Sequence, residues 1–378
     1  MTEIEVALAI SARDWPDRIH RFLADHGGAR VRAQILSADD ATTEAFQVLI
    51  IDDICSFLTP RLVDKVRRQG RMVLGVFDPA EAPEGKERLL ECGVDLVIEA
   101  DAEADEFVIA LRTLALTDEP IPTEAVPTAA TRSSRNLVVI GGPPGGCGAT
   151  ELAVAWADRL SVRGPTVLID FDEVAPSLAQ RLGLHLLPNL RSALDALTHR
   201  ADTLGRNLVQ VDRFMVLTGL SGERDWMEIR PGQISDLLAE LGGQFKHVVA
   251  NCGSSLEQVG FADAGRFGIS RQVVVSADHL VGVGLPTPIG VTRLLSWVAE
   301  STTLNPAAQT HLVVNRRPRS RYRRAEVVEE IERALPGVSV SFLPEDPQVV
   351  TAAWNGALVS SGPYVRTARK LVDQVTKP

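Results

Sequence analysis

Short apolar runs alternate along most of this chain with longer segments whose apolar residues recur every three or four positions. Apolar runs of four to six residues predict buried strands, and the three-to-four-residue period predicts helices with one buried face. Strands and helices that alternate in this way are typical of α/β domains with a parallel sheet. We therefore expect an α/β protein.

The first part of the chain, residues 1–116, contains five such alternations. The predicted strands are residues 6–10, 31–36, 47–51, 72–76 and 95–98. The predicted helices are residues 15–26, 60–69, 86–92 and 105–116. Five alternations predict one doubly wound, flavodoxin-like domain. Residues 117–135 contain three prolines and little apolar bulk, which predicts an extended linker.

Residues 136–378 repeat the alternation on a larger scale. Here the predicted strands are residues 137–140, 166–169, 214–218, 247–251, 272–276, 310–315 and 338–342. Helical patterns cover residues 178–182, 234–241 and 287–299. A segment of this length with this pattern predicts a second, larger doubly wound domain.

Composition places the chain among ordinary cytoplasmic proteins. No apolar run approaches the roughly 20 residues of a membrane span, and the start is acidic where a secretory signal is basic. The four cysteines lack metal-ligand spacing, which favours a reducing compartment. Residues 1–118 carry 23 acidic and 13 basic side chains, and so hold the whole net charge of −10. This imbalance argues against the first domain lying on nucleic acid or anionic lipid.

A glycine-rich segment, residues 141–150, follows the predicted strand 137–140 and leads into a helical pattern. In this context glycines bring backbone N–H groups close to phosphate, and the helix N-terminus adds its dipole. A phosphate loop also needs a lysine before its final Ser or Thr, and Ala149 holds that position. Alone, the segment fits either a nucleotide site or a plain tight turn.

Five segments resemble, in the right order, motifs of the MinD/ParA superfamily of ATPases. They are the deviant phosphate loop at 144–150, switch I at 170–172, the Walker B strand at 248–251, the adenine-reading strand at 311–316 and the base-closing loop at 343–347. Five ordered matches are more specific than any one of them. The resemblance implies a P-loop domain of the MinD/ParA type.

The resemblance also implies a set of site residues. Those expected to bind nucleotide are Gly145, Gly146, Cys147, Gly148, Ala149, Thr150, Asn251, Asn315, Pro344, Glu345 and Asp346. Thr150 and Asp170 are the residues that would hold Mg²⁺, and Asp170 and Asp172 are the remaining candidates for catalysis.

Three departures weaken the chemistry that the resemblance implies. Ala149 replaces the lysine that clamps the phosphates, Pro144 replaces the signature lysine, and Asn251 replaces the Walker B aspartate. One charge-assisted hydrogen bond to phosphate is worth about 1.5–3 kcal/mol, so each loss weakens binding about ten- to hundredfold. We expect weak or absent binding of ATP or ADP with Mg²⁺, and little or no hydrolysis. The open alternative is a slow ATPase whose lysine comes from elsewhere in the chain or from a partner.

The first domain resembles a response-regulator receiver, with Asp52 at the position of the phosphoacceptor. The supporting residues are absent: residues 11–13 lack the acidic pair for Mg²⁺, Phe77 replaces the switch Ser or Thr, and Glu99 replaces the lysine. A glutamate there repels an aspartyl phosphate. We expect a receiver-like interaction domain that is not phosphorylated.

A receiver-like domain joined to a MinD/ParA-like domain resembles the CpaE/TadZ branch, and within it the actinobacterial septum site-determining (Ssd) proteins. This resemblance implies a cytoplasmic positioning or scaffold protein that is recruited to a pole or septum. Its expected partners are proteins of the division or pilus and secretion machinery, with a homodimer as a further expectation.

Two basic segments leave alternatives open. Residues 316–324, the arginine run, contain six arginines, which suit either a DNA-facing or lipid-facing patch or a solvated loop paired with nearby glutamates. The amphipathic stretch 365–375 lacks Trp and Phe, so we expect a helix packed on the domain rather than a membrane-targeting helix.

Overall fold

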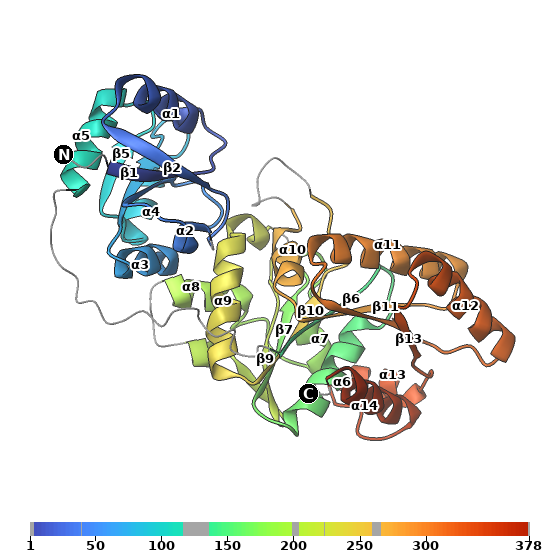
Figure 1. Ribbon diagram of the computed structural model, residues 1–378. Helices are drawn as coiled ribbons and strands as arrows, with labels where there is room; N and C mark the ends of the chain where they lie inside the picture. Colours follow the sequence, from blue (N-terminus) through green and yellow to red (C-terminus); the bar gives the residue numbers. More distant parts are fainter. Residues whose placement is uncertain are drawn as a thin grey trace. The chain divides into compact units, whose positions relative to one another are not determined.

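The computed structural model describes residues 4–38, 40–115, 136–198, 204–222, 224–258 and 266–376 (Figure 1). These residues form two compact units, a first unit of residues 4–115 and a second unit that begins at residue 136. The linker expected at 117–135 lies outside the described residues. Each unit is considered by itself.

The first unit is built on a five-stranded sheet in the order β2-β1-β3-β4-β5, with every pairing parallel. Its strands are β1 (Ile4–Ala9), β2 (Ala29–Ile35), β3 (Val48–Asp52), β4 (Met72–Phe77) and β5 (Leu96–Glu99). Its helices are α1 (Trp15–His26), α2 (Asp40–Thr43), α3 (Pro60–Arg68), α4 (Gly85–Glu91) and α5 (Ala104–Ala115). This strand order is that of flavodoxin-like doubly wound sheets.

Strand β3 shows why the first unit has a core on each face of its sheet. All five of its residues are buried, and side chains alternate between the two faces. Leu49 and Ile51 join one apolar cluster, and Val48 and Ile50 join the other. A continuous apolar run is therefore what the middle of a sheet covered by helices requires.

The second unit has an eight-stranded sheet in the order β13-β12-β11-β6-β10-β7-β9-β8, in which only β8 is antiparallel to its neighbour. The strands are β6 (Asn136–Gly141), β7 (Thr166–Phe171), β8 (Val209–Val211), β9 (Phe214–Leu217), β10 (His247–Cys252), β11 (His279–Gly284), β12 (Gln309–Val314) and β13 (Ser339–Phe342). The helices are α6 (Ala149–Ser161), α7 (Leu178–Leu182), α8 (Leu190–Thr198), α9 (Pro231–Gln244), α10 (Gly268–Val275), α11 (Pro288–Leu304), α12 (Arg321–Ala334), α13 (Pro347–Trp354) and α14 (Pro363–Val375), with short 3₁₀ turns η1 (Leu204–Asn207) and η2 (Asp225–Glu228).

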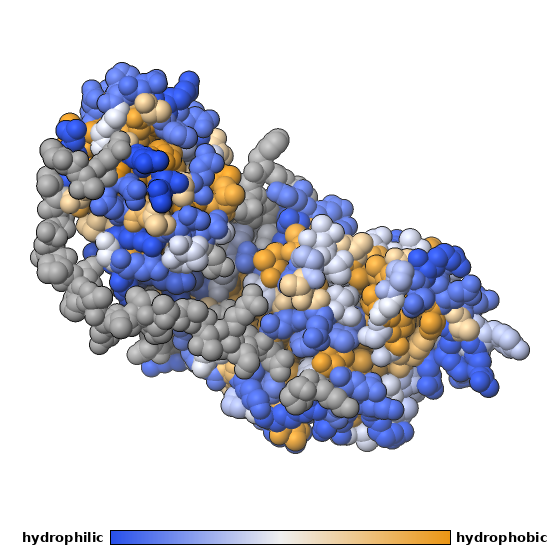
Figure 2. Space-filling view, viewed as in Figure 1, coloured by the Kyte–Doolittle hydropathy of each residue, from blue (hydrophilic) through white to orange (hydrophobic). Residues whose placement is uncertain are grey.

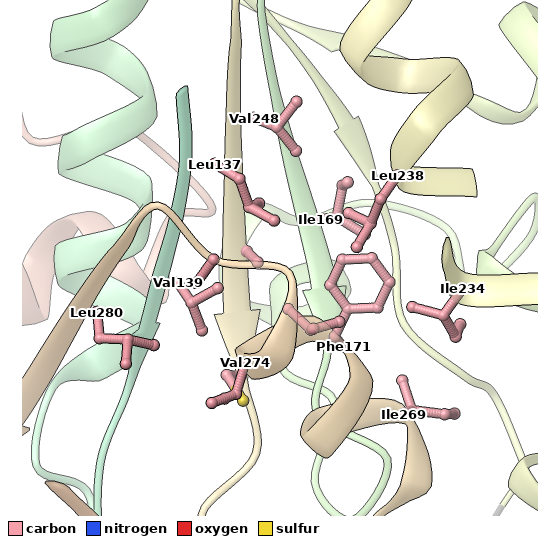
Figure 3. Packing of buried hydrophobic residues seen from close by; sticks show 14 of the residues in the cluster. Leu137, Val139, Ile169, Phe171, Ile234, Leu238, Val248, Ile269, Val274 and Leu280 are labelled. Carbon is pink, nitrogen blue, oxygen red and sulfur yellow. The ribbon is translucent and has the colours of Figure 1, made fainter. Parts of the chain in front are cut away.

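Helices α9 and α10 close one face of this sheet. Figure 3 shows Ile234 and Leu238 of α9 and Ile269 of α10 pointing toward Phe171 at the end of β7. Phe171 is fully buried in this cluster. Truncation of such a core phenylalanine to alanine costs about 3–5 kcal/mol.

The prediction of a strand at residues 272–276 is wrong, because this segment lies in α10. Its β-branched residues Val273 and Val274 are buried, as they would be in a strand. The Glu173 carboxylate, however, accepts hydrogen bonds from backbone N–H groups in the first turn of this segment and so stabilises the start of a helix. The strand is β11, which follows. Its Gly282 and Gly284 interrupt the apolar pattern, and a Cβ at either would lie 2.8 Å from a side chain of α11.

The last helix, α14, packs on α6, as expected from the sequence. Its buried face includes Tyr364, Leu371 and Val372. Arg159 of α6 donates two hydrogen bonds of 2.8 Å to the Asp373 carboxylate. Among the described residues no helix is long and apolar enough to span a membrane.

Candidate functional site

The glycine-rich segment forms a loop between β6 and α6, and two of its glycines are required by shape. A Cβ at Gly142 would lie 2.1 Å from the Val283 carbonyl oxygen. Gly148 has a φ of 96°, and a Cβ there would lie 2.2 Å from Nδ2 of Asn315. Side-chain-bearing residues rarely adopt this conformation. The backbone of a phosphate loop is therefore present and tightly held.

A cavity of about 770 Å³ opens over this loop. Each residue expected to bind nucleotide lines it, together with Asp172. Asp170 is not among the lining residues. The segments singled out from the sequence therefore lie together at the carboxyl ends of the parallel strands, where open α/β sheets bind their ligands.

The charges around this cavity do not suit a triphosphate. Among the described residues that line it, Arg316 carries the only positive charge, against carboxylates at Glu151, Asp172, Glu345 and Asp346. Glu151 is neutralised by Arg181 of α7, whose Nη2 lies 3.0 Å from Oε2. Ala149 and Pro144, where the resemblance leads us to expect lysines, also line the cavity. The loop therefore has the backbone shape expected of a phosphate loop but not the lysine side chains.

Asp170 is a buried carboxylate at the end of β7, with 1% of its surface exposed. Oδ2 accepts hydrogen bonds from the N–H groups of Ser177 (2.7 Å) and Leu178 (2.8 Å). Oδ1 accepts one of 2.9 Å from Nδ2 of Asn251, its register partner on β10. Burial raises the pKa of Asp170 to about 6, although these donors act in the opposite direction. Both carboxylate oxygens of Asp170 therefore accept hydrogen bonds from within the protein.

The other expected Mg²⁺ and catalytic groups are also engaged within the chain. The Thr150 hydroxyl lies 2.9 Å from that of Ser177. Oδ1 of Asp172 accepts hydrogen bonds from the N–H groups of Val174 (3.0 Å) and Ala175 (2.9 Å). A hard divalent cation needs open oxygen ligands. The oxygens expected to hold Mg²⁺ are thus mostly hydrogen-bonded within the chain, which suits the ion poorly.

Two residues expected near the base also brace the protein. Nδ2 of Asn315 donates a hydrogen bond of 2.9 Å to the Cys147 carbonyl oxygen. The Asp346 carboxylate caps α13 through the N–H of Gln348 and also accepts a hydrogen bond from the N–H of Tyr364. These hydrogen bonds connect the walls of the cavity to one another.

The carboxyl end of β3 in the first unit carries the other expected site. Asp52 is fully buried, and Oδ2 accepts hydrogen bonds from the Ser11 hydroxyl and from Nε1 of Trp15, the latter at 3.1 Å. Arg13, 6% exposed, forms an ion pair with the neighbouring buried Asp53. Burial raises the pKa of Asp52, and the hydrogen bonds from Ser11 and Trp15 oppose this shift. An internal cation thus occupies the acidic end of this sheet.

The remaining receiver-like positions lie on neighbouring strands. Phe77 ends β4 and pairs in register with Glu99, which ends β5 and is exposed. Sequence reasoning identified Asp52 but missed Asp53 and the role of Arg13. A basic residue three positions after the predicted strand 6–10 was the available signal.

The arginine run lies between β12 and the first turns of α12, at the end of the second unit where Figure 2 shows hydrophilic residues. Arg324 donates hydrogen bonds to the carbonyl oxygens of Pro318 and Arg319, and Arg323 pairs with Glu326 at 2.9 Å. Tyr322, between Arg321 and Arg323, is 85% exposed. Part of the run is therefore structural, and part faces solvent.

The expected set leaves out several residues that line the cavity, and three of them are unusual. Trp354 is 86% exposed at the cavity mouth, and Arg316 has a φ of 54°, stabilised by a hydrogen bond from its N–H to Oδ1 of Asn315. The buried Tyr364 also lines the cavity, and its hydroxyl has no hydrogen-bond partner among the described residues. The exposure of Trp354 and the backbone strain at Arg316 could not be predicted from the sequence pattern.

Comparison with known proteins gives similarity in fold. The cell division ATPase MinD of Pyrococcus furiosus matches with a TM-score of 0.52 and 17% identity over 64% of this chain and 98% of its own. The septum site-determining protein MinD of Pyrococcus horikoshii, solved with Mg-ADP, has a TM-score of 0.52 and 16% identity over 64% of this chain and 96% of its own. A ParA family ATPase from Chlorobium tepidum has a TM-score of 0.54 and 17% identity over 64% of this chain and 98% of its own.

No protein-family model matches the chain, and no curated protein does so. Sequence identities of 16–17% with solved structures establish likeness of fold and nothing finer. The expected P-loop fold is confirmed at that level. This chain contains an α/β domain with the fold of MinD and ParA family ATPases.

Proposed function

We propose that this chain is a cytoplasmic positioning or scaffold protein of the MinD/ParA type, in which the ATPase fold has lost turnover. The observation that carries this proposal is the cavity itself: its phosphate loop keeps the required backbone shape, while the lysine positions are filled by Ala149 and Pro144. Phosphoryl transfer depends on positioning and on stabilising spreading negative charge. Removal of one such stabilising group commonly lowers the rate by a factor of about 10²–10³. The loss of several such groups therefore leaves little of the catalytic rate.

The inward-facing Asp170 supports the same proposal. Asn251 donates to its carboxylate where a second carboxylate would help hold a metal. We infer weak or absent binding of ATP or ADP, with or without Mg²⁺. The branch that we propose is CpaE/TadZ-like, close to the Ssd proteins, with action at a septum or at a pilus or secretion apparatus near a pole.

The first unit is proposed as a receiver-like module that binds partner proteins without phosphorylation. Its support is the flavodoxin-like strand order together with the ion pair of Arg13 and Asp53, which fills the acidic end of the sheet with an internal charge. The expected partners are proteins of the division or the pilus and secretion machinery.

Calorimetric titration with ATP and ADP, each with and without Mg²⁺, tests this function together with an ATPase assay. We expect weak or undetectable heats and no phosphate release above a protein-free blank. A Mg²⁺-dependent rate that persists through purification and is abolished in Thr150→Ala contradicts the proposal.

A slow ATPase is the second candidate, and Arg316 is the observation that favours it. It carries the only positive charge among the described lining residues. If it replaces the missing lysine, Arg316→Ala abolishes nucleotide binding. The neighbouring Arg317→Ala removes the same charge from an exposed position outside the cavity lining and serves as the control.

DNA binding is a third candidate, favoured by Tyr322, which stands exposed between two arginines. Phosphate contacts make affinity fall steeply with salt, by about one unit of logarithmic slope per contact. If the run binds DNA, replacement of Arg317, Arg319 and Arg321 by alanine flattens that slope. Equal weak retention of both proteins at low salt contradicts DNA binding.

A further inference from the structure

Strand β13 is one edge of the eight-stranded sheet, and no strand in the described part of the chain pairs with its outer side. An edge strand presents a row of unpaired backbone N–H and C=O groups, which natural proteins usually protect with charged residues, prolines or bulges. Strand β13 has none of these, since its four residues are Ser, Val, Ser and Phe and its register with β12 is unbroken. This edge is therefore open to pairing with a further strand.

Helix α12 runs beside this edge and forms one wall of a groove of about 760 Å³, with Phe342 of β13 on the other side. Figure 1 shows α12 at the outer end of the second unit. The inner side of α12 packs Val327 and Ile331 into the core, whereas Ala325 and Val328 on the groove side are exposed. No described residue that lines this groove also lines the cavity over the β6–α6 loop. The groove is thus a separate surface.

The charges on the groove side of α12 are arranged about Val328, which is 37% exposed. Arg324 lies one turn before Val328 and Glu332 lies one turn after it, and both line the groove. Residues four apart share one face of a helix. The neighbouring Arg333 pairs with Glu330 at 2.8 Å, but neither Arg324 nor Glu332 has an ion-pair partner among the described residues. One end of the groove is therefore positive and the other negative.

We propose that this edge is the interface for a second copy of this chain, with the two β13 strands antiparallel about a two-fold axis that passes beside Val328. Such an axis reverses the direction of α12, so residues equally far before and after Val328 face each other. Arg324 of each copy then meets Glu332 of the other, and the two Val328 side chains meet at the axis. Pairing of the two β13 strands joins both eight-stranded sheets into one continuous sheet.

Three contributions act together in this interface. Backbone hydrogen bonds join the two edges, and contact between the apolar residues Ala325, Val328 and Phe342 of the two copies removes them from water. The two charge pairs select the antiparallel orientation, because a parallel one would place Arg324 against Arg324. No part of the interface uses nucleotide or the phosphate loop, so the inference does not rest on the proposed function.

Sedimentation equilibrium of the full chain at several concentrations, without nucleotide, measures the association. We expect a concentration-dependent dimer for the wild type. Val328→Arg places two positive charges together at the axis and should lower the association constant by a factor of about ten or more. Val275→Arg is the matched control, because Val275 is 49% exposed at the end of α10 and lies outside the groove. Both positions are exposed, so thermal unfolding should match that of the wild type.

A mixing experiment tests the register of the two helices. Arg324→Glu alone brings glutamates together at both charge pairs, and Glu332→Arg alone brings arginines together, so each variant should be monomeric where the wild type dimerises. An equimolar mixture of the two variants should dimerise again, because every contact between them joins opposite charges. Recovery in the mixture also shows that neither variant has lost its fold.

Amide hydrogen exchange gives a second readout at the edge itself. Residues 339–342 should exchange more slowly as the protein concentration rises, because their outer N–H groups become paired. A wild type that is monomeric at every concentration overturns the inference. A dimer that Val328→Arg leaves intact, or a mixture of the two charge variants that stays monomeric, overturns it as well.

Discussion

Both units place a buried aspartate at the carboxyl end of a central parallel strand, and they neutralise it in different ways. In the first unit a cation does so: Arg13 pairs with Asp53 beside Asp52, and both carboxylates are fully buried. In the second unit neutral donors do so: Asp170 accepts hydrogen bonds from two backbone N–H groups and from Asn251. The cavity beside Asp170 stays open.

The two units therefore differ in their charged groups and in how open they are to a ligand. The first unit has two buried carboxylates with an arginine beside them, and the second has an open cavity with few positive charges. Phosphoryl chemistry requires both at one place. Neither unit has both in one place, and this is the basis on which we propose binding rather than catalysis.

The largest effect is expected from removing the internal cation. Arg13→Ala removes the cation that pairs with the buried Asp53, and loss of one member of a buried pair costs about 3–5 kcal/mol. Amide hydrogen exchange in β1 and β3 measures this loss for the first unit alone. Arg21→Ala, at an exposed position of α1, should change stability by less than about 0.5 kcal/mol. Equal protection in both variants would show that the ion pair contributes little.

The second unit should show a smaller, pH-dependent effect. Burial raises the pKa of Asp170 from 3.8 to about 6. Between about pH 4 and 6 the unfolded chain loses this proton while the folded chain keeps it, so stability falls as pH rises and is constant above this window. The fall is about 3 kcal/mol. Asp170→Asn cannot titrate, so its unfolding free energy should lack this component. If the unfolding free energies of the variant and the wild type change with pH in the same way, Asp170 does not contribute this component.

Restoring one charge to the open cavity sharpens the comparison. Ala149→Lys returns a cation to the first residue of α6, and we expect ATP or pyrophosphate to bind about ten- to hundredfold more tightly. Hydrolysis should stay absent, because Pro144 and Asn251 remain. Val162→Lys adds the same charge at the exposed C-terminal end of α6 and should not change the affinity measured by calorimetry. A gain from both variants would mean non-specific attraction.

No effect is expected from phosphodonors on the first unit. Asp52 is fully buried and already accepts hydrogen bonds from Ser11 and Trp15. Small phosphodonors should therefore leave the mass of the intact protein unchanged. A gain of one phosphoryl group that disappears in Asp52→Asn would show that the cluster opens.

The alternation of apolar runs predicted most strands within one or two residues, as for β3, because a buried strand must be apolar throughout. Two strands were not predicted, the short β8 and β11, and the second case is instructive. Strand β11 contains Gly282 and Gly284, which allow the close approach of α11, and its apolar pattern is therefore weak. The valines of α10, in contrast, form an apolar run like that of a strand. Packing between elements decided both cases.

The candidate site was predictable where one short segment carries the signal, as in the phosphate loop. The hydrogen bond between Asn251 and Asp170 was not, because it depends on the register of β10 against β7. The outward position of Trp354 was not predictable either, since an isolated tryptophan in a helical pattern usually belongs to a core. These features depend on contacts between residues far apart in the chain.

The docking of α14 on α6 has a consequence for biosynthesis. The five strands of the first unit lie within one continuous segment, so that unit can complete its fold while the ribosome is still translating the rest. The second unit cannot, because α6 leaves the ribosome early and waits for residues 363–375 to cover it. Until then its apolar face is exposed to chaperones and proteases, so a stalled or truncated chain should present a finished first unit joined to an unfinished second one.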